Sequence, residues 1–214
     1  MLDLLKAHLQ KAPELTEGIP EKVEKDADVL ALKRIAIHWL PKLGDGHILS
    51  IGPAMGWELI ELGKKYEGKR VIGLTLFQEE VDGLLARGLE GFRADMHSLP
   101  SDWTNTMSLV YANSVCEHSP APFIMLTEFA RVLKPGGYLA VIMPEPGCVM
   151  HIGNLERFKR MDAFPHHLFL PGTDTMIGLI RRVGLEFIML KQIAHMSLSH
   201  LCGWHHWYLA RKRG

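Results

Sequence analysis

The stretch that decides the fold runs Ile48-Leu49-Ser50-Ile51-Gly52-Pro53-Ala54-Met55-Gly56-Trp57-Glu58. It begins with a short apolar run, which is typical of a buried strand. Gly52 then allows a tight turn in which a ligand approaches the backbone without meeting a Cβ atom. Gly56 allows close packing where the next helix opens, with its free N–H groups pointing at the ligand. The stretch predicts a strand–turn–helix unit with a ligand at the turn, although a glycine pair alone also fits a purely structural turn.

Apolar runs continue to alternate with amphipathic stretches along the chain. Strands are expected at 70–75, 92–95, 108–112 and 138–143, with two last strands within 185–193 and 207–210. The apolar faces of the expected helices are Leu59, Leu62 and Tyr66; Val81, Leu84 and Leu85; Phe123, Leu126, Ala130 and Leu133; and Met176, Ile177, Ile180 and Val183. A sharp turn is expected at Pro135-Gly136-Gly137. This order predicts a mainly parallel sheet covered on both faces, with ligands outside the carboxyl ends of its strands.

The length of 214 residues suits one domain. Leu32, Ile35, Ala36, Trp39 and Leu40 recur at helical spacing before Pro41. We therefore expect a single domain over residues 1–214, made of an N-terminal helical segment, 1–43, and a core, 44–214.

The composition bounds the class of partner. Lys+Arg 24 and Asp+Glu 24 cancel, which argues against binding nucleic acid or anionic lipid by bulk charge. The three cysteines lie far apart, so reduced thiols in a cytoplasmic protein are expected. The N-terminus lacks the apolar core of a signal peptide, and no apolar run approaches the roughly 20 residues that span a bilayer. No membrane association is expected.

Three segments together resemble the class I S-adenosylmethionine (SAM)-dependent methyltransferases, with motifs of the methyltransferase-11 type. They are the glycine turn, Asn113-Ser114-Val115-Cys116-Glu117-His118, and Arg131-Val132-Leu133-Lys134-Pro135-Gly136-Gly137, the most specific of the three. The resemblance covers about residues 46–212. It implies a three-layer α/β/α Rossmann-like fold, whose seven-stranded, mostly parallel sheet has an antiparallel last strand. It also implies SAM as the cofactor and S-adenosyl-L-homocysteine as the product.

The resemblance also implies which residues meet the cofactor. The backbone around Gly52, Pro53 and Gly56 is expected at its methionine and ribose parts. Asp95 matches the family carboxylate that accepts a hydrogen bond from the adenine amino group, and Met96 is expected against the adenine ring. The cofactor site implied in this way consists of Ser50, Gly52, Pro53, Gly56, Thr75, Leu76, Asp95, Met96, Asn113 and Ser114.

Two of these positions depart from the family pattern. Ser50 and Thr75 stand where the family usually carries acidic residues, which engage the methionine end and the ribose hydroxyls. The loss implies weaker SAM binding, or a ribose held elsewhere, with Gln78 as one candidate. Gly73-Leu74-Thr75-Leu76 is also similar to a segment of cyclopropane fatty-acid synthases and sterol methyltransferases, which bind SAM without that acid.

Candidate catalytic residues follow the fourth strand. Methyl transfer from a sulfonium needs alignment and a dry site, and a base only where the acceptor loses a proton. Histidine titrates near neutrality, so His118 is the candidate base. The resemblance to the cyclopropane synthases implies that Glu117 helps to organise the site. The competing interpretation is that the pair fixes the loop. His166 and His167 are expected at the acceptor pocket.

Twelve histidines raise the question of a metal. His195 with His200, or His205 with His206, are the pairs to weigh. No HExxH motif is present, and adjacent histidines in a strand face opposite sides, so no metal site is expected.

The prediction is a SAM-dependent methyltransferase acting on a small-molecule acceptor, as a monomer or a homodimer. Two alternatives stay open. The first is a non-catalytic SAM-binding regulatory or partner protein of the same fold, and the second is a lipid-directed methyltransferase resembling the cyclopropane synthases.

Overall fold

A seven-stranded sheet in the order β3-β2-β1-β4-β5-β7-β6 organises the chain. The computed structural model describes residues 34–144, 167–196 and 202–214. The strands are β1 His47–Ile51, β2 Val71–Thr75, β3 Glu90–Arg93, β4 Met107–Asn113, β5 Leu133–Pro144, β6 Leu185–Met196 and β7 Cys202–Lys212. β1 to β5 pair in parallel, whereas β7 runs antiparallel to both β5 and β6. The expected sheet, with an antiparallel last strand, is confirmed.

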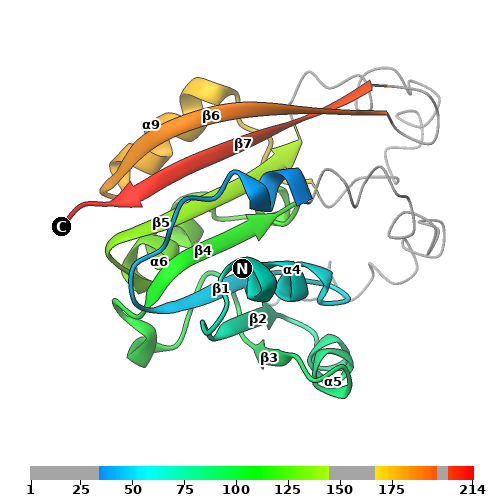
Figure 1. Ribbon diagram of the computed structural model, residues 1–214. Coiled ribbons are helices and arrows are strands. Elements are labelled where there is room, and N and C mark those ends of the chain that lie inside the picture. Colours follow the sequence, from blue (N-terminus) through cyan, green and yellow to red (C-terminus); the bar gives the residue numbers. More distant parts are fainter. Residues whose placement is uncertain (1–33, 145–166, 197–201) are drawn as a thin grey trace.

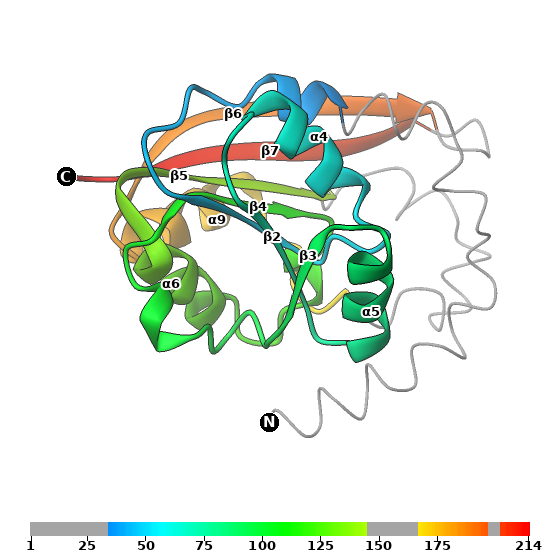
Figure 2. The same cartoon turned by 60° about the horizontal axis from the view of Figure 1, so that its bottom comes forward.

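Helices cover both faces of this sheet (Figures 1 and 2). The described helices are α4 Trp57–Lys65, α5 Gln78–Ala86, α6 Pro122–Val132 and α9 Thr173–Arg182, with the 3-10 turns η1 Ser101–Trp103 and η2 Cys116–His118, and residues 34–38 are also helical. None of the helices in this part of the chain is long and apolar enough to cross a membrane.

Strand alternation divides the core into two layers. Along β1, the side chains of Leu49 and Ile51 join the cluster that contains Leu126 of α6 and Ile180 of α9. Ile48 points the other way and joins the cluster built from α4 and residues 36–40. Because strand side chains alternate between faces, an unbroken apolar run indicates a strand buried on both sides. That is why the four-residue run at 48–51 predicted β1 correctly.

Three local predictions are wrong in detail. Leu85 and Phe123 are 56% and 49% exposed, because the buried stripes of their helices run through Leu84 and Phe129 instead. The third strand begins two residues earlier than expected, at Glu90. The turn expected at Pro135-Gly136-Gly137 lies inside β5 as a break in its register with β4.

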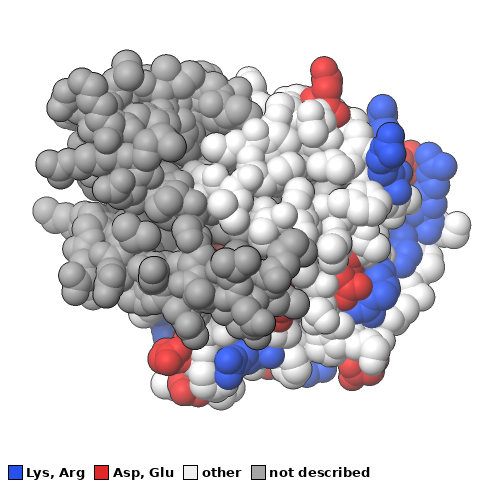
Figure 3. All heavy atoms as spheres, turned by 180° about the vertical axis from the view of Figure 1, so that it is seen from behind, with Lys and Arg blue, Asp and Glu red and all other residues white. Residues whose placement is uncertain are grey.

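Charge is spread without a continuous basic surface on the face shown in Figure 3, which views the molecule from behind. Lys and Arg gather toward one edge of that face, with Asp and Glu between them, and its described middle carries few charges. This pattern agrees with the formal net charge of zero.

Candidate functional site

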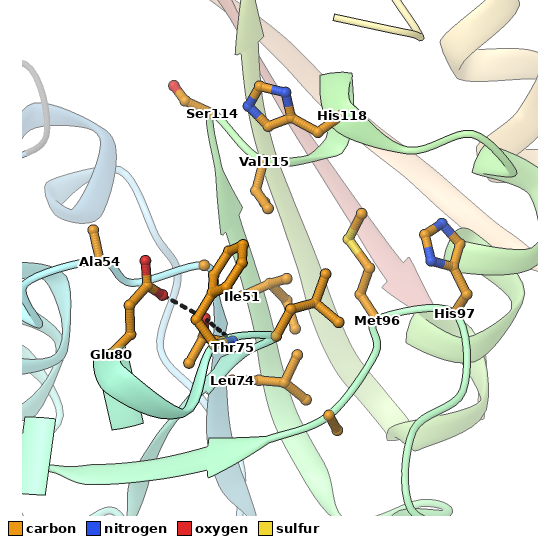
Figure 4. A pocket seen from close by; sticks show the side chains of 14 residues that line it. Ile51, Ala54, Leu74, Thr75, Glu80, Met96, His97, Ser114, Val115 and His118 are labelled. Atoms are coloured by element: carbon orange, nitrogen blue, oxygen red, sulfur yellow. Dashed lines mark hydrogen bonds between the residues drawn. The ribbon is translucent and has the colours of Figure 1, made fainter. Parts of the chain in front are cut away.

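A pocket opens at the carboxyl ends of β1, β2, β3 and β4, beside the point where the strand order reverses. It is lined by Ile51, Gly52, Ala54, Leu74, Thr75, Leu76, Phe77, Glu80, Ala94, Met96, His97, Ser114, Val115 and His118. Figure 4 shows Ser114 and His118 on one side and Thr75 with Glu80 on another. The reversal between β2-β1 and β1-β4 leaves a crevice there, which is where open α/β sheets bind ligands.

The two glycines of the β1 turn have different roles. Gly52 has φ 62°, and a Cβ added to it would lie 2.9 Å from a methyl carbon of Val115. Gly56 has φ 78° and begins α4, where a Cβ would lie 2.5 Å from side-chain atoms of Leu84 and Leu89. Gly52 therefore packs directly against Val115 in the lining of the pocket, whereas Gly56 packs against α5 and the segment after it.

A carboxylate from α5 reaches the end of β2. The Thr75 hydroxyl donates a short hydrogen bond to Glu80 Oε2, and both residues line the pocket. Gln78, the residue suggested from the sequence, donates its amide to Asp82 on the exposed side of α5. Glu80 therefore places a carboxylate at the end of β2, five residues after Thr75 in the sequence.

Asp95, directly after β3, is held by His97. Asp95 Oδ1 accepts hydrogen bonds from the backbone N–H of His97 at 2.9 Å and from His97 Nδ1 at 2.7 Å. His97 Nε2 lies 2.8 Å from the hydroxyl of Ser119, so the imidazole joins the end of β3 to the segment after η2. Met96 and His97 line the pocket, whereas Asp95 is not among the lining residues.

A buried carboxylate, that of Glu58, stands at the tip of β4. Asn113 Nδ2 donates to Glu58 Oε1 at 2.6 Å, and the Glu58 side chain on α4 is buried. Ser50 pairs with Tyr111 across β1 and β4 and is itself fully buried. Burial and the nearby Glu58 carboxylate both raise the pKa of Tyr111. Glu58 thus supplies a carboxylate next to the strand position where Ser50 has none.

Glu117 and His118 lie in η2, where His118 lines the pocket and Glu117 is buried. Burial raises the pKa of Glu117 to about 8, with a hydrogen bond from its own backbone N–H acting in the opposite direction. The rings of His118 and His167 have centres 5.1 Å apart. The structure therefore brings one of the two predicted acceptor-pocket histidines to the predicted catalytic pair; His166 lies outside the described residues.

The pocket gathers part of the predicted site. Its lining includes Gly52, Thr75, Leu76, Met96, Ser114 and His118. The lining does not include the other predicted cofactor residues, which are Ser50, Pro53, Gly56, Asp95 and Asn113. Glu80 and His97 were not predicted. Glu80 reads as an ordinary acidic residue in the first turn of a helix, and only its five-residue spacing from Thr75 hinted at a contact.

Strand order and site together define the class I methyltransferase fold. Comparison with known proteins gives the same result, since residues 49–141 match the family model described as a methyltransferase domain. Comparison with curated protein sequences gives no match. This chain therefore has the class I methyltransferase fold, and a little under half of its residues match the methyltransferase domain model.

Solved structures of several organisms share the fold. One chain comes from the complex between the Trm112 methyltransferase activator of Haloferax volcanii and its methyltransferase (TM-score 0.75, 15% identity, covering 95% of this chain and 96% of that one). Another is a SAM-dependent methyltransferase of Methanosarcina mazei (TM-score 0.66, 18% identity, covering 84% of this chain and 97% of that one). A third is phosphoethanolamine N-methyltransferase 2 of Haemonchus contortus in complex with SAM (TM-score 0.66, 15% identity, covering 85% of this chain and 52% of that one). At these identities the likeness establishes the fold alone.

Proposed function

We propose that this protein transfers a methyl group from SAM to a small-molecule acceptor. The observation that carries the proposal is the pocket at the tips of β1 to β4, with a carboxylate at one side and His118 at another. The sulfonium of SAM supplies an activated methyl group. The protein then has to align donor and acceptor and exclude water.

The residues present fit such a cofactor. Glu80 offers an acceptor for the ribose hydroxyls, held in place by Thr75. Gly52 lines the pocket and has no side chain, so a ligand can approach its main chain. Met96, Ala94 and Leu76 supply an apolar wall for the adenine ring. We assign the amino group of the adenine to Asp95, whose Oδ1 is already fixed by His97.

The acceptor enters, in this proposal, on the side of His118. Ser114 is exposed beside it, and the carbonyl oxygen of Glu117 ties the segment containing Leu168 and Phe169 to η2. His118 is therefore the side chain that meets the reacting group, with His167 next to it. The formal net charge of zero gives no bulk attraction for a polyanionic acceptor, which agrees with a small or neutral one.

Calorimetric titration with SAM and with S-adenosyl-L-homocysteine tests the cofactor. We expect saturable binding of both, weakened in Asp95→Ala. The acceptor is then sought with methyl-labelled SAM over phenols, amines, carboxylic acids and lipid extracts. Absence of binding of either compound at millimolar concentration would contradict the proposal.

A second candidate is methyl transfer that depends on an activator subunit. It is favoured by the likeness to the Haloferax volcanii chain, which forms a complex with such an activator. Gel filtration with light scattering, followed by labelled-SAM assays on the isolated chain, separates the two. Turnover by the isolated chain would exclude a required activator.

A further inference from the structure

Three side chains with metal-ligating atoms converge at η2. One oxygen of Glu117 and one ring nitrogen each of His118 and His167 all lie within 4.8 Å of one another. They come from two segments far apart in the sequence. Two imidazoles and a carboxylate are a ligand set that divalent first-row transition metals use in proteins, with a further position left for water or substrate.

The main chain builds this meeting point. The backbone N–H groups of Leu168 and Phe169 both donate to the carbonyl oxygen of Glu117, at 2.7 and 3.0 Å. These two bonds fix the residues after His167 against η2, so His167 reaches the cluster through backbone geometry. Substituting a side chain of the cluster leaves this connection in place.

The carboxylate of Glu117 has the surroundings of an ion ligand. Its side chain is 1% exposed, and Oε2 has no hydrogen-bond partner among the described residues. A buried carboxylate is strongly unfavourable unless a cation or donors meet it. A cation between the carboxylate and the two imidazoles would supply what it lacks.

The two rings are already spaced for a shared ion. Their centres lie 5.1 Å apart at 51° between planes, which is not a stacked pair. Two imidazoles on one tetrahedral ion, with metal–nitrogen distances of about 2.0–2.1 Å, have ring centres about 5 Å apart. Small side-chain rotations would therefore bring the three ligand atoms around one ion.

We propose that Glu117, His118 and His167 bind one divalent transition-metal ion of the zinc type. The fourth position of this ion faces the pocket, because His118 lines the pocket next to Ser114 and Val115. A hydroxyl or carbonyl oxygen of the acceptor would occupy that position, and this role rests on the proposed methyl transfer. Binding to the ion would orient the oxygen and lower the pKa of a hydroxyl acceptor.

Zinc and cobalt binding test the site directly and without SAM. Tag-free protein, stripped with a chelator, is titrated with Zn²⁺ by calorimetry and with Co²⁺ by visible absorption, where a four-coordinate site gives intense d–d bands.

Since the chain has 12 histidines, variants are needed to assign the binding to this cluster. We expect Glu117→Gln, His118→Gln and His167→Gln each to weaken one site at least about tenfold. The control His38→Gln, which changes an exposed histidine, should leave that site unchanged. Mg²⁺ should bind far more weakly, because it prefers oxygen ligands.

The outcomes separate this proposal from the methyltransferase proposal. Zn²⁺ binding that is absent at about 100 μM, or equal in wild type and His167→Gln, overturns the metal site. His167→Gln retains the backbone bonds to Glu117, so it is informative even if Glu117→Gln does not fold. SAM affinity is measured on the same variants. Zn²⁺ binding without SAM binding would leave the metal site standing and remove the proposed function.

Discussion

Thr75 at the end of β2 and Glu80 in the first turn of α5 share a short hydrogen bond inside the pocket. Thr75 Oγ1 also accepts a bond from the backbone N–H of Phe77 at 3.3 Å. This second bond aims the hydroxyl proton at Glu80. The two residues thus hold the Glu80 carboxylate near the end of β2. The resemblance implies an acidic residue at the end of this strand, where this chain has Thr75.

We predict that Glu80→Gln weakens SAM binding by about tenfold or more. Hydrogen bonds to a charged group contribute roughly 1.5–3 kcal/mol, and 1.4 kcal/mol corresponds to a factor of ten in Kd. Calorimetric titration of SAM measures the change. Glu79→Gln is the matched control, because Glu79 is the exposed neighbour on the same helical turn. Equal SAM affinity in the two variants would show that Glu80 does not contact the cofactor.

Gly56 is predicted to tolerate no side chain. Gly56→Ala places a residue with a Cβ in the left-handed region, which costs about 1–2 kcal/mol, and presses against Leu84 and Leu89. We expect the free energy of unfolding to fall by about 2–4 kcal/mol in urea denaturation followed by circular dichroism. A fall below 0.5 kcal/mol, taken as roughly the size of a surface substitution, would contradict this account.

Gly83 supplies the opposite case within α5. It is exposed, and a Cβ added there has nothing within 4 Å. Gly83→Ala should therefore raise the free energy of unfolding by about 0.5–1 kcal/mol, since alanine restricts the unfolded chain and favours a helix. The two substitutions add the same methyl group, so an opposite sign isolates the effect of backbone conformation and space.

The strands of the sheet could be predicted from the sequence because each strand is marked by a short run of neighbouring apolar residues. The buried run ending at Ile51 and the run 108–112 each predict a strand from neighbouring side chains alone. The same reasoning pointed to the loops after Ile51, Leu74, Ala94 and Ala112, because strand ends meet at one edge of a parallel sheet. The choice of Met96 and His118 within these loops came from the family resemblance.

The contacts that the sequence did not reveal depend on how two elements meet in space, whether those elements are neighbours in the chain or far apart. Glu80 points back at β2 only because of where α5 starts. His167 meets Glu117 and His118 through backbone bonds that span about fifty residues of sequence. Such pairings depend on the path of the chain in space, and no spacing rule for a single helix or strand encodes them. The sequence argument against a metal site considered only histidine pairs and the HExxH motif. It therefore did not consider a cluster formed by Glu117, His118 and His167, which are brought together by the path of the chain.

Glu128 gives a prediction about pH. Its carboxylate accepts hydrogen bonds from Arg131 Nη2 and from the backbone N–H of Leu99, each at 2.8 Å, and so ties α6 to the loop after β3. The hydrogen bond from Arg131 lowers the pKa of Glu128, although burial acts in the opposite direction. A lowered pKa means that the folded state binds this proton more weakly than the unfolded state. The stabilisation is therefore present above the unfolded-state pKa and is lost as the pH falls through the folded-state pKa.

We expect Glu128→Gln to lower the free energy of unfolding by about 1–2 kcal/mol at pH 7. The difference from wild type should begin to shrink as the pH falls below the unfolded-state pKa of about 4.3, and it should vanish only once the pH lies below the lowered folded-state pKa of Glu128. Urea denaturation across pH 3.5 to 7, taken as about the titration range of a carboxyl group, measures it. Asp102→Asn, at an exposed position in the loop that follows β3, is the control and should show no such trend. A penalty independent of pH would assign the loss to packing instead of charge.

Lys212 near the C-terminus closes α6 and gives the last prediction. Its Nζ donates to the carbonyl oxygens of Ala130 at 2.7 Å and Leu133 at 2.8 Å, and to Asn105 Oδ1 at 2.8 Å. The last carbonyls of a helix have no partner within the helix, and a cation there is favoured by the helix dipole. From the sequence, Arg211-Lys212-Arg213 reads as a solvated basic tail, because Ala130 lies 82 residues away. We expect Lys212→Met to lower the free energy of unfolding by about 1–3 kcal/mol, whereas Arg213→Met, at an exposed position, changes it by less than 0.5 kcal/mol. Urea denaturation of the two variants measures this difference. Equal stability would mean that hydrogen bonds from water stabilise these carbonyl groups as well as Lys212 does.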